Sequence, residues 1–195
     1  MRIVSGEFRG RVLHAPPGAG TRPTSDRARQ AVFNILEHAP WSPGLRGLRV
    51  MDLFAGSGAL GLEALSRGAA FCLFVETDTG ARGAIRENVD AFGLFGKSRI
   101  HRRDATDLGA KPASDGPPFS LAFLDPPYGQ GLGERALAGL AAGGWLDSNA
   151  VVVLEKGIGE AAPHLDGFEI VDARDYGAAR VHFLKTLRST AIPCD

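Results

Sequence analysis

The sequence of 195 residues is poor in cysteine, lysine and long apolar runs. Its two cysteines, Cys72 and Cys194, form neither a disulfide framework nor a zinc knuckle. The longest apolar run, residues 69–75, is far shorter than the roughly 20 residues of a membrane span. Residues 1–7 lack the apolar core of a signal peptide. The histidines show no metal-ligand spacing, so we predict no metal. These absences favour a cytoplasmic enzyme or binding domain.

An excess of charge is also lacking, because 22 basic residues balance 22 acidic ones. This balance argues against a uniformly basic nucleic-acid binder. The distribution is uneven, however, since residues 1–29 carry six arginines and only two acids. Clustered arginine is typical of a nucleic-acid surface, and a solvated basic face is the alternative. The six are Arg2, Arg9, Arg11, Arg22, Arg27 and Arg29.

The first part of the chain is predicted to be a small arm on a single domain. Residues 2–13 alternate loosely and turn at residues 8–10, which indicates a β-hairpin that must pack on the body or on a partner. We place the arm at residues 1–20 and the domain at residues 21–195. A helix then follows, capped by Thr24 or Ser25. Its predicted apolar stripe is Ala28, Ala31, Val32, Ile35 and Leu36.

From residue 48 onward the pattern alternates between strand, turn and helix. Nearly all-apolar strands of this kind are typical of parallel strands that are covered on both faces. The pattern predicts an α/β fold with a mostly parallel, doubly wound sheet of seven strands and an antiparallel C-terminal strand. The expected strands are 49–54, 71–76, 98–102, 119–124, 150–155, 168–175 and 180–187. One helix is expected to end at residue 67, and two others to span 79–92 and 132–142.

Three glycines follow the first of these strands. Gly56, Gly58 and Gly61 have the GxGxxG spacing of a nucleotide-binding turn. Small residues there let a ligand approach the backbone and let the helix pack close to the strand. A dinucleotide is the default ligand of such a turn.

Acidic residues near the ends of successive strands point to a different ligand. Asp52 lies where an ammonium group would be favoured over a pyrophosphate, and Glu76 suits a ribose diol. Asp104 could hold an adenine amine. Together with Asp125 they are expected at the carboxyl edge of the sheet, where open α/β sheets bind ligands. A cationic amino-acid nucleoside, S-adenosylmethionine, fits this set. Taken singly, each acid is more often a helix cap or a solvated charge.

Residues 119–129 end an apolar strand in Asp-Pro-Pro-Tyr-Gly. Proline restricts the backbone and removes a donor, so Asp125 and the carbonyl of Pro126 become two rigidly held acceptors beside the Tyr128 ring. Such acceptors suit a planar group that carries an amine. The alternative is a strand that ends in a tight turn.

These motifs together resemble known proteins. Residues 52–61 and 125–128 resemble the class I S-adenosylmethionine-dependent amino-methyltransferases. Residues 2–11, 22–29 and 54–67 are similar to the RsmD family, bacterial methyltransferases of small-subunit ribosomal RNA. The resemblance implies a Rossmann-like class I methyltransferase fold, with S-adenosylmethionine as cosubstrate. It also implies methylation of the N2 amine of one guanine, in RNA already assembled with proteins.

The predicted site residues form three groups. The acceptor group, predicted to be catalytic, is Asp125, Pro126, Pro127 and Tyr128. Tyr128 would stack on the base, and Asp125 or water would take the proton. The cofactor group is Asp52, Phe54, Ala55, Gly56, Ser57, Gly58, Glu76, Thr77, Asp104 and Ala105. The predicted RNA phosphate contacts are Arg9, Arg11, Arg22, Arg27 and Arg29.

Four other functions stay open at this point. A DNA adenine-N6 methyltransferase would also use Asp-Pro-Pro-Tyr, but 195 residues leave little room for a target-recognition domain. A protein-glutamine methyltransferase would favour asparagine over Asp125. A nicotinamide-dependent oxidoreductase explains the glycines alone, and a catalytically silent RNA-binding module explains the arginines alone. The expected partner is small-subunit ribosomal RNA in an assembled or assembling subunit, bound by a monomer without any membrane contact.

Overall fold

A computed structural model describes residues 1–16 and 25–187. Seven strands form one sheet in the order β3-β2-β1-β4-β5-β7-β6. Every neighbouring pair is parallel except β5 with β7 and β7 with β6. The strands are β1 Arg49–Leu53, β2 Phe71–Val75, β3 Ser98–His101, β4 Phe119–Leu124, β5 Leu146–Gly157, β6 Phe168–Tyr176 and β7 Ala179–Thr186. The helices are α1 Asp26–His38, α2 Ala59–Ser66, α3 Thr79–Ala91 and α4 Leu132–Ala142, with short 3-10 turns η1 Phe95–Lys97 and η2 Ala113–Asp115.

This architecture confirms the predicted Rossmann-like α/β fold. The main difference concerns β5, which begins at Leu146 rather than at residue 150. The added segment pairs with β4, since Leu146 lies opposite Phe119. The register then shifts, and the regular parallel pairing begins with Leu121 opposite Val151. The helix capped by Ser25 also forms as expected, since the Ser25 side chain accepts the N–H of Ala28. Thr24 lies outside the described residues.

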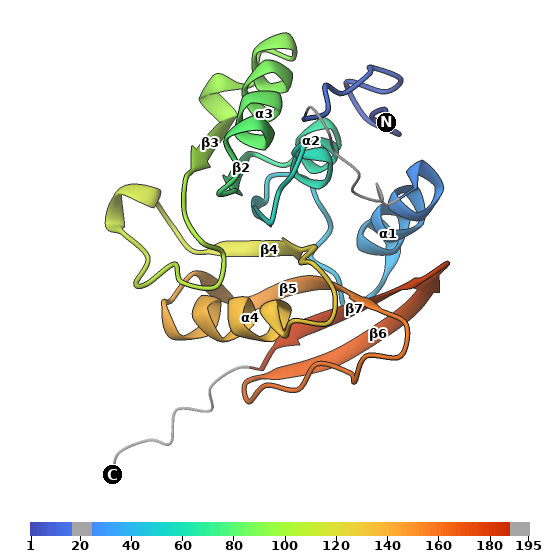
Figure 1. Ribbon diagram of the computed structural model, residues 1–195, viewed down its shortest axis with the longest axis vertical. Helices are drawn as coiled ribbons and strands as arrows, with labels where there is room; N and C mark the ends of the chain where they lie inside the picture. The colour runs from blue at the N-terminus through green and yellow to red at the C-terminus, as the bar shows by residue number, and fades with distance from the viewer. Residues whose placement is uncertain (17–24, 188–195) are drawn as a thin grey trace.

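The sheet separates two apolar cores. Successive strand residues point to opposite faces, so Val50 belongs to one core and Met51 to the other. Side chains of α1, α2 and α3 pack in the first core, and side chains of α4 pack in the second. Figure 1 shows α4 on the other side of the sheet from those three helices.

The N-terminal arm folds back on itself with less regular pairing than predicted. Among the described residues it has a single antiparallel bridge, between Arg2 and Val12. The bridge is made by the bonds from Ile3 N to Arg11 O at 3.0 Å and from Leu13 N to Met1 O at 3.1 Å, and the bond from Gly10 N to Ile3 O at 2.8 Å closes the turn. The predicted hairpin is therefore a compact loop with one bridge rather than two strands.

The arm is attached to the body by its own backbone. The N–H groups of Val4 and Ser5 donate to the buried carboxylate of Glu63 in α2, at 2.7 and 3.0 Å. The Phe8 ring stacks on Phe92 with their centroids 5.0 Å apart. These contacts meet the expectation that the arm must pack on the main body, because an isolated hairpin is only marginally stable in water.

Candidate active site

The carboxyl ends of four neighbouring parallel strands lie in register. In three of these strands the last apolar residue is followed directly by an acid, which is Glu76, Asp125 or Glu155. Parallel pairing therefore brings three carboxylates to one edge of the sheet. The row of paired residues is Val75 in β2, Leu53 in β1, Leu124 in β4 and Leu154 in β5.

The turn between β1 and α2 is tight and strained. Phe54 has a φ of 58°, and within residues 1–16 and 25–187 it is the only residue other than glycine with a positive φ. Gly56 and Gly58 also have positive φ, which glycine adopts without steric cost. At Gly61 an added Cβ would lie 2.5 Å from the Cys72 sulfur and closer still to the Phe74 ring. The glycine spacing therefore brings α2 against β2, as predicted.

Asp52 turns toward this helix. Its side chain is 1% exposed and accepts the backbone N–H of Gly61 at 2.8 Å. Burial raises the pKa of Asp52 well above its ordinary value, and the charges of Asp125 and Glu76 act in the same direction, while the Gly61 bond opposes them. Asp52 therefore anchors the first turn of α2, and its predicted role toward the ammonium group of a ligand stays a prediction.

Glu76 remains at the edge and supports the glycine turn. Its carboxylate accepts the N–H of Gly56 at 2.8 Å and the N–H of Asp78 at 2.9 Å. Asp78 in turn caps α3 by accepting the N–H of Ala81. Thr77, between the two acids, is exposed. Glu76 thus joins the turn to the start of α3, and it is half-buried at the sheet edge.

Asp104 makes its hydrogen bonds within its own loop. It is exposed and accepts the backbone N–H and the hydroxyl of Thr106, at 2.8 and 2.7 Å. These two bonds lower the pKa of Asp104, and the nearby charge of Arg135 also lowers it. Its neighbour Ala105 is buried in the second core. Asp52, Glu76 and Asp125 are close enough to interact electrostatically, whereas Asp104 is held by its own loop.

Asp125 and Pro126 supply two hydrogen-bond acceptors that no described residue donates to. Pro126 is buried and Asp125 is half-buried just beyond β4. No hydrogen bond from within residues 1–16 and 25–187 reaches the Asp125 carboxylate or the Pro126 carbonyl oxygen. Burial raises the pKa of Asp125 to about 7, and the negative charge of Glu155 adds to the shift. These acceptors are therefore available to donors on a ligand.

Glu155 is the site residue that the sequence interpretation missed. It lies in β5 beside the acceptor group, and its carboxylate accepts the Tyr128 hydroxyl. The Tyr128 side chain is 39% exposed and stands at the edge of the sheet. One signal was present in the sequence, because Glu155 ends the strand predicted at 150–155 and so falls on the ligand-binding edge.

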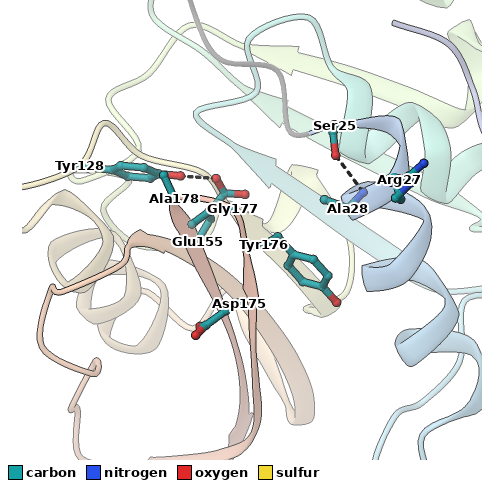
Figure 2. Close-up of a pocket in the computed structure, with 10 residues that line it drawn as sticks. Ser25, Arg27, Ala28, Tyr128, Glu155, Asp175, Tyr176, Gly177 and Ala178 are labelled. Carbon is teal, nitrogen blue, oxygen red and sulfur yellow. Dashed lines mark hydrogen bonds between the residues drawn. The ribbon is translucent and has the colours of Figure 1, made fainter.

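A cavity of about 620 Å³ opens next to Tyr128 and Glu155. Ser25, Arg27 and Ala28 at the start of α1 form the opposite wall (Figure 2). The turn between β6 and β7 closes a third side, and from it the Tyr176 ring projects toward α1 (Figure 2). This size suits a small-molecule or single-base site, for which volumes of about 300–1,000 Å³ are usual.

The predicted RNA-contacting arginines fall into different environments. Arg9, Arg11 and Arg27 are exposed. The Arg11 guanidinium lies over the Phe92 ring at 4.6 Å and donates to Ala91 O at 2.8 Å. Arg22 lies outside the described residues.

Arg29 requires a correction. Its side chain is 1% exposed and donates to Asp26 at 2.8 Å and to the carbonyl of Arg2. Its Nε lies 3.8 Å from the buried carboxylate of Glu63, which also pairs with Arg67. Arg29 therefore has no surface to offer a phosphate, because it compensates a buried charge beneath the arm. We remove it from the expected RNA contacts.

Within the described residues, no cluster of three or more His, Cys, Asp or Glu side chains is arranged to hold a metal ion. No helix in the described parts of the chain is long and apolar enough to cross a membrane.

Comparison with known proteins places this site in a family. The family model described as "Conserved hypothetical protein 95" matches residues 1–185. Ribosomal RNA small subunit methyltransferase D of Escherichia coli strain K12 is 36% identical over 163 residues, which cover 84% of this chain and 78% of that protein. The chain belongs to this family. The resemblance to the RsmD family is confirmed.

Other relatives agree with this assignment to the RsmD family. The Ribosomal RNA small subunit methyltransferase D of Haemophilus influenzae is 34% identical over 156 residues, covering 80% of this chain and 78% of that protein. A solved structure of the Escherichia coli protein yhhF superposes with a TM-score of 0.79 at 30% identity, covering 96% of this chain and 98% of that one. The similarity therefore includes the C-terminal strands, where no sequence motif was recognised.

Proposed function

We propose that this protein transfers a methyl group from S-adenosylmethionine to the N2 amine of a guanine in small-subunit ribosomal RNA. The observation that carries the proposal is a pair of acceptors that no described residue donates to, the Asp125 carboxylate and the Pro126 carbonyl. Their neighbours Tyr128 and Glu155 line a cavity of base size. Family membership supports the RNA substrate, since the relatives in Escherichia coli and Haemophilus influenzae are named for methylation of small-subunit ribosomal RNA.

The residues at the sheet edge fit S-adenosylmethionine better than a dinucleotide. The negative charges of Asp125 and Glu76 add to burial in raising the pKa of Asp52, so this edge of the sheet is electronegative. A pyrophosphate would add negative charge to this edge, whereas a sulfonium and an ammonium would neutralise it. Glu76 and the open backbone around Gly56 would hold the nucleoside, and an added Cβ at Gly56 would meet no atom within 4 Å. When bound, the cosubstrate supplies an electrophilic methyl group.

The acceptor group would orient the amine for attack. The lone pair of a guanine N2 amine is delocalised into the ring, so the amine is a poor nucleophile. Asp125 and the Pro126 carbonyl would each accept one N–H, which directs the lone pair away from them and favours tetrahedral geometry. Catalysis then comes mainly from positioning and electrostatics. The ionised form of Asp125 accepts best, and Asp125 or water takes the proton that the amine releases.

The target base must leave its stack to reach these acceptors. The exposed Tyr128 ring stands at the mouth of the cavity and would stack on the base, which is how proteins commonly hold unstacked bases. The cavity continues from Tyr128 to α1 and the β6–β7 turn, so it has room for the sugar and its phosphates. Arg27, on the far wall, is positioned for a phosphate.

Exposed arginines would extend the RNA surface over residues 1–29. Arg9 and Arg27 are exposed, and each phosphate contact they make would steepen the salt dependence of binding. We expect Arg27→Ala to lower the slope of log affinity against log salt by about 1. Arg29→Ala should instead destabilise the fold, because it removes a buried guanidinium that contacts Asp26, the carbonyl of Arg2 and the carboxylate of Glu63. Filter binding over a salt series and thermal unfolding distinguish the two effects.

A methyl-transfer assay tests the proposal. The protein is incubated with tritiated S-adenosylmethionine and, separately, with naked small-subunit ribosomal RNA, small ribosomal subunits lacking the modification, and DNA. Digestion and nucleoside analysis then identify the product. We expect N2-methylguanosine, formed most efficiently in assembled or assembling subunits. Label found only as N6-methyladenine in DNA would contradict the proposal, and binding of RNA without any transfer would indicate a non-catalytic module.

A further inference from the structure

We propose that Glu155 accepts the ring N1–H of the target guanine and thereby excludes adenine from the site. This inference rests on the proposed function and deepens it, since it assigns the choice of base to one residue. The positions of Asp125 and Glu155 on neighbouring strands, together with the cavity wall that Glu155 shares with Tyr128, carry the argument.

Asp125 and Glu155 lie side by side at the edge of the sheet. Leu124 of β4 pairs with Leu154 of β5, so the next residue on each strand is one of these two acids. Neighbouring strands are about 4.8 Å apart. The Glu155 charge is felt at Asp125, where it raises the carboxyl pKa. Glu155 also lines both the large cavity and a smaller hollow that Asp125 lines.

The spacing of these acids matches the donors of guanine. On its pairing edge guanine presents N1–H next to the N2 amine, and thus two adjacent donor groups. Adenine presents its N6 amine next to N1, which is an acceptor. If Asp125 takes the amine in both cases, Glu155 receives a donor from guanine but faces a lone pair of adenine. A site built to receive a donor discriminates against an analogue that lacks it, because the negative carboxylate of Glu155 would face the lone pair of adenine N1 in place of an N–H.

Tyr128 holds Glu155 in place for this role. Its hydroxyl donates to one oxygen of the Glu155 carboxylate. An ionised carboxylate has about four lone-pair sites and can accept several donors at once, so the bond from Tyr128 is compatible with a donor from the base. The Tyr128 ring would also stack on the base. Tyr128 would therefore position both the base and the Glu155 carboxylate that binds its N1–H. Glu155 is a specificity-determining residue in this arrangement, and Asp125 is the residue at the reacting amine.

The test replaces the target guanine by 2-aminopurine, which keeps the amine at C2 but has an unprotonated N1. Mass spectrometry of RNA fragments first locates the guanine that the wild-type protein methylates in small subunits. Subunits are then reconstituted with RNA that carries guanine or 2-aminopurine at that position. We expect wild-type kcat/KM to favour guanine by at least about tenfold, the factor that one hydrogen bond to a charged group provides. Glu155→Gln should reduce this preference to within about threefold, because its amide can donate to N1.

Two comparisons separate this role from a structural one. Tyr128→Phe removes the hydroxyl but keeps the carboxylate, so activity on both bases should fall while the preference for guanine persists. If Glu155 only supported Tyr128, Glu155→Gln would lower both rates by the same factor, and that result would overturn the inference. Equal wild-type rates on the two bases would also overturn it while leaving guanine methylation established. Absence of N2-methylguanosine with the wild-type protein would overturn the proposed function as well.

Discussion

Asp52 and Asp125 are two carboxylates near the carboxyl ends of the neighbouring strands β1 and β4, and their surroundings differ. Burial raises the pKa of both. Asp52 is almost fully covered and is paired with the Gly61 N–H, whereas no described residue donates to Asp125. The first carboxylate completes the protein's own structure, and the second depends on a ligand for its donors. The comparison teaches that a buried acid marks a site only where the fold leaves it without a donor.

The largest expected effect comes from exchanging each acid for its amide. Asp125→Asn should lower kcat by about 10²–10⁴-fold, because an amide cannot replace the charged acceptor and adds an N–H toward the amine. Asp52→Asn keeps an oxygen for the Gly61 N–H, so kcat and the KM for S-adenosylmethionine should stay within about threefold. Steady-state kinetics measures both, with equilibrium binding of the cosubstrate as the control. A larger loss in Asp52→Asn would reverse the comparison.

The glycine turn should respond to added volume through stability. Gly61→Ala places a methyl group against Cys72 and Phe74, and overpacking of this kind costs about 1–3 kcal/mol. Gly83→Ala, inside α3, is the matched control, since its added Cβ meets no atom within 4 Å. That change should stabilise the protein by about 0.5–1 kcal/mol. Denaturant unfolding of the two variants is the measurement, and equal stabilities would contradict the close packing of α2 on β2.

The pH dependence of methyl transfer should report Asp125. With its pKa at about 7, the ionised acceptor becomes about tenfold more abundant between pH 6 and pH 8, and kcat should rise with it. Glu155→Gln removes the neighbouring negative charge and should move the midpoint of the profile to lower pH. Glu169→Gln, an exposed change of the same charge on β6, is the control and should leave the midpoint in place. A profile flat between pH 6 and pH 8 in the wild type would argue against Asp125 as the acceptor.

The last expected effect is a gain of stability in Asp125→Asn. Because the folded protein holds the Asp125 proton more tightly than the unfolded chain, wild-type stability falls as pH rises from about 4 to about 7 and the cost is complete above that range. The variant escapes this cost, so its advantage in thermal unfolding should grow between pH 5 and pH 8. Each kcal/mol corresponds to about 2–4 °C in Tm for a chain of this size. An advantage that shrinks with rising pH would contradict the raised pKa.

The fold and the edge of acids were predictable because their signals are local. Short apolar runs define the strands, and parallel connections bring the residues that follow them to one edge. Asp125 was found in this way, since an apolar strand ends directly in Asp-Pro-Pro-Tyr. Glu155 carried the same signal at the end of its own strand. Its importance became visible only when the register placed it beside Asp125 and the side chains placed it against Tyr128.

What could not be predicted depends on contacts between distant segments. Arg29 belongs to an arginine-rich stretch, yet besides Asp26 in its own helix it contacts Glu63 in α2 and the carbonyl of Arg2, which lie near it only in the folded chain. The inward turn of Asp52 has a similar origin, because the first N–H groups of a helix lack partners within the helix and Gly61 supplies one here. The β6–β7 turn reaches the cavity through sheet topology, so no motif in that stretch announced it.

The most direct test of the central contrast is a titration of the aspartate carboxyl carbons by ¹³C NMR, with Asp125→Asn and Asp52→Asn used for assignment. For Asp125 we predict a pKa of about 7 in the wild-type protein and a lower value in Glu155→Gln. An Asp125 carboxyl that titrates at the ordinary value of about 4, unaffected by Glu155→Gln, would contradict the account.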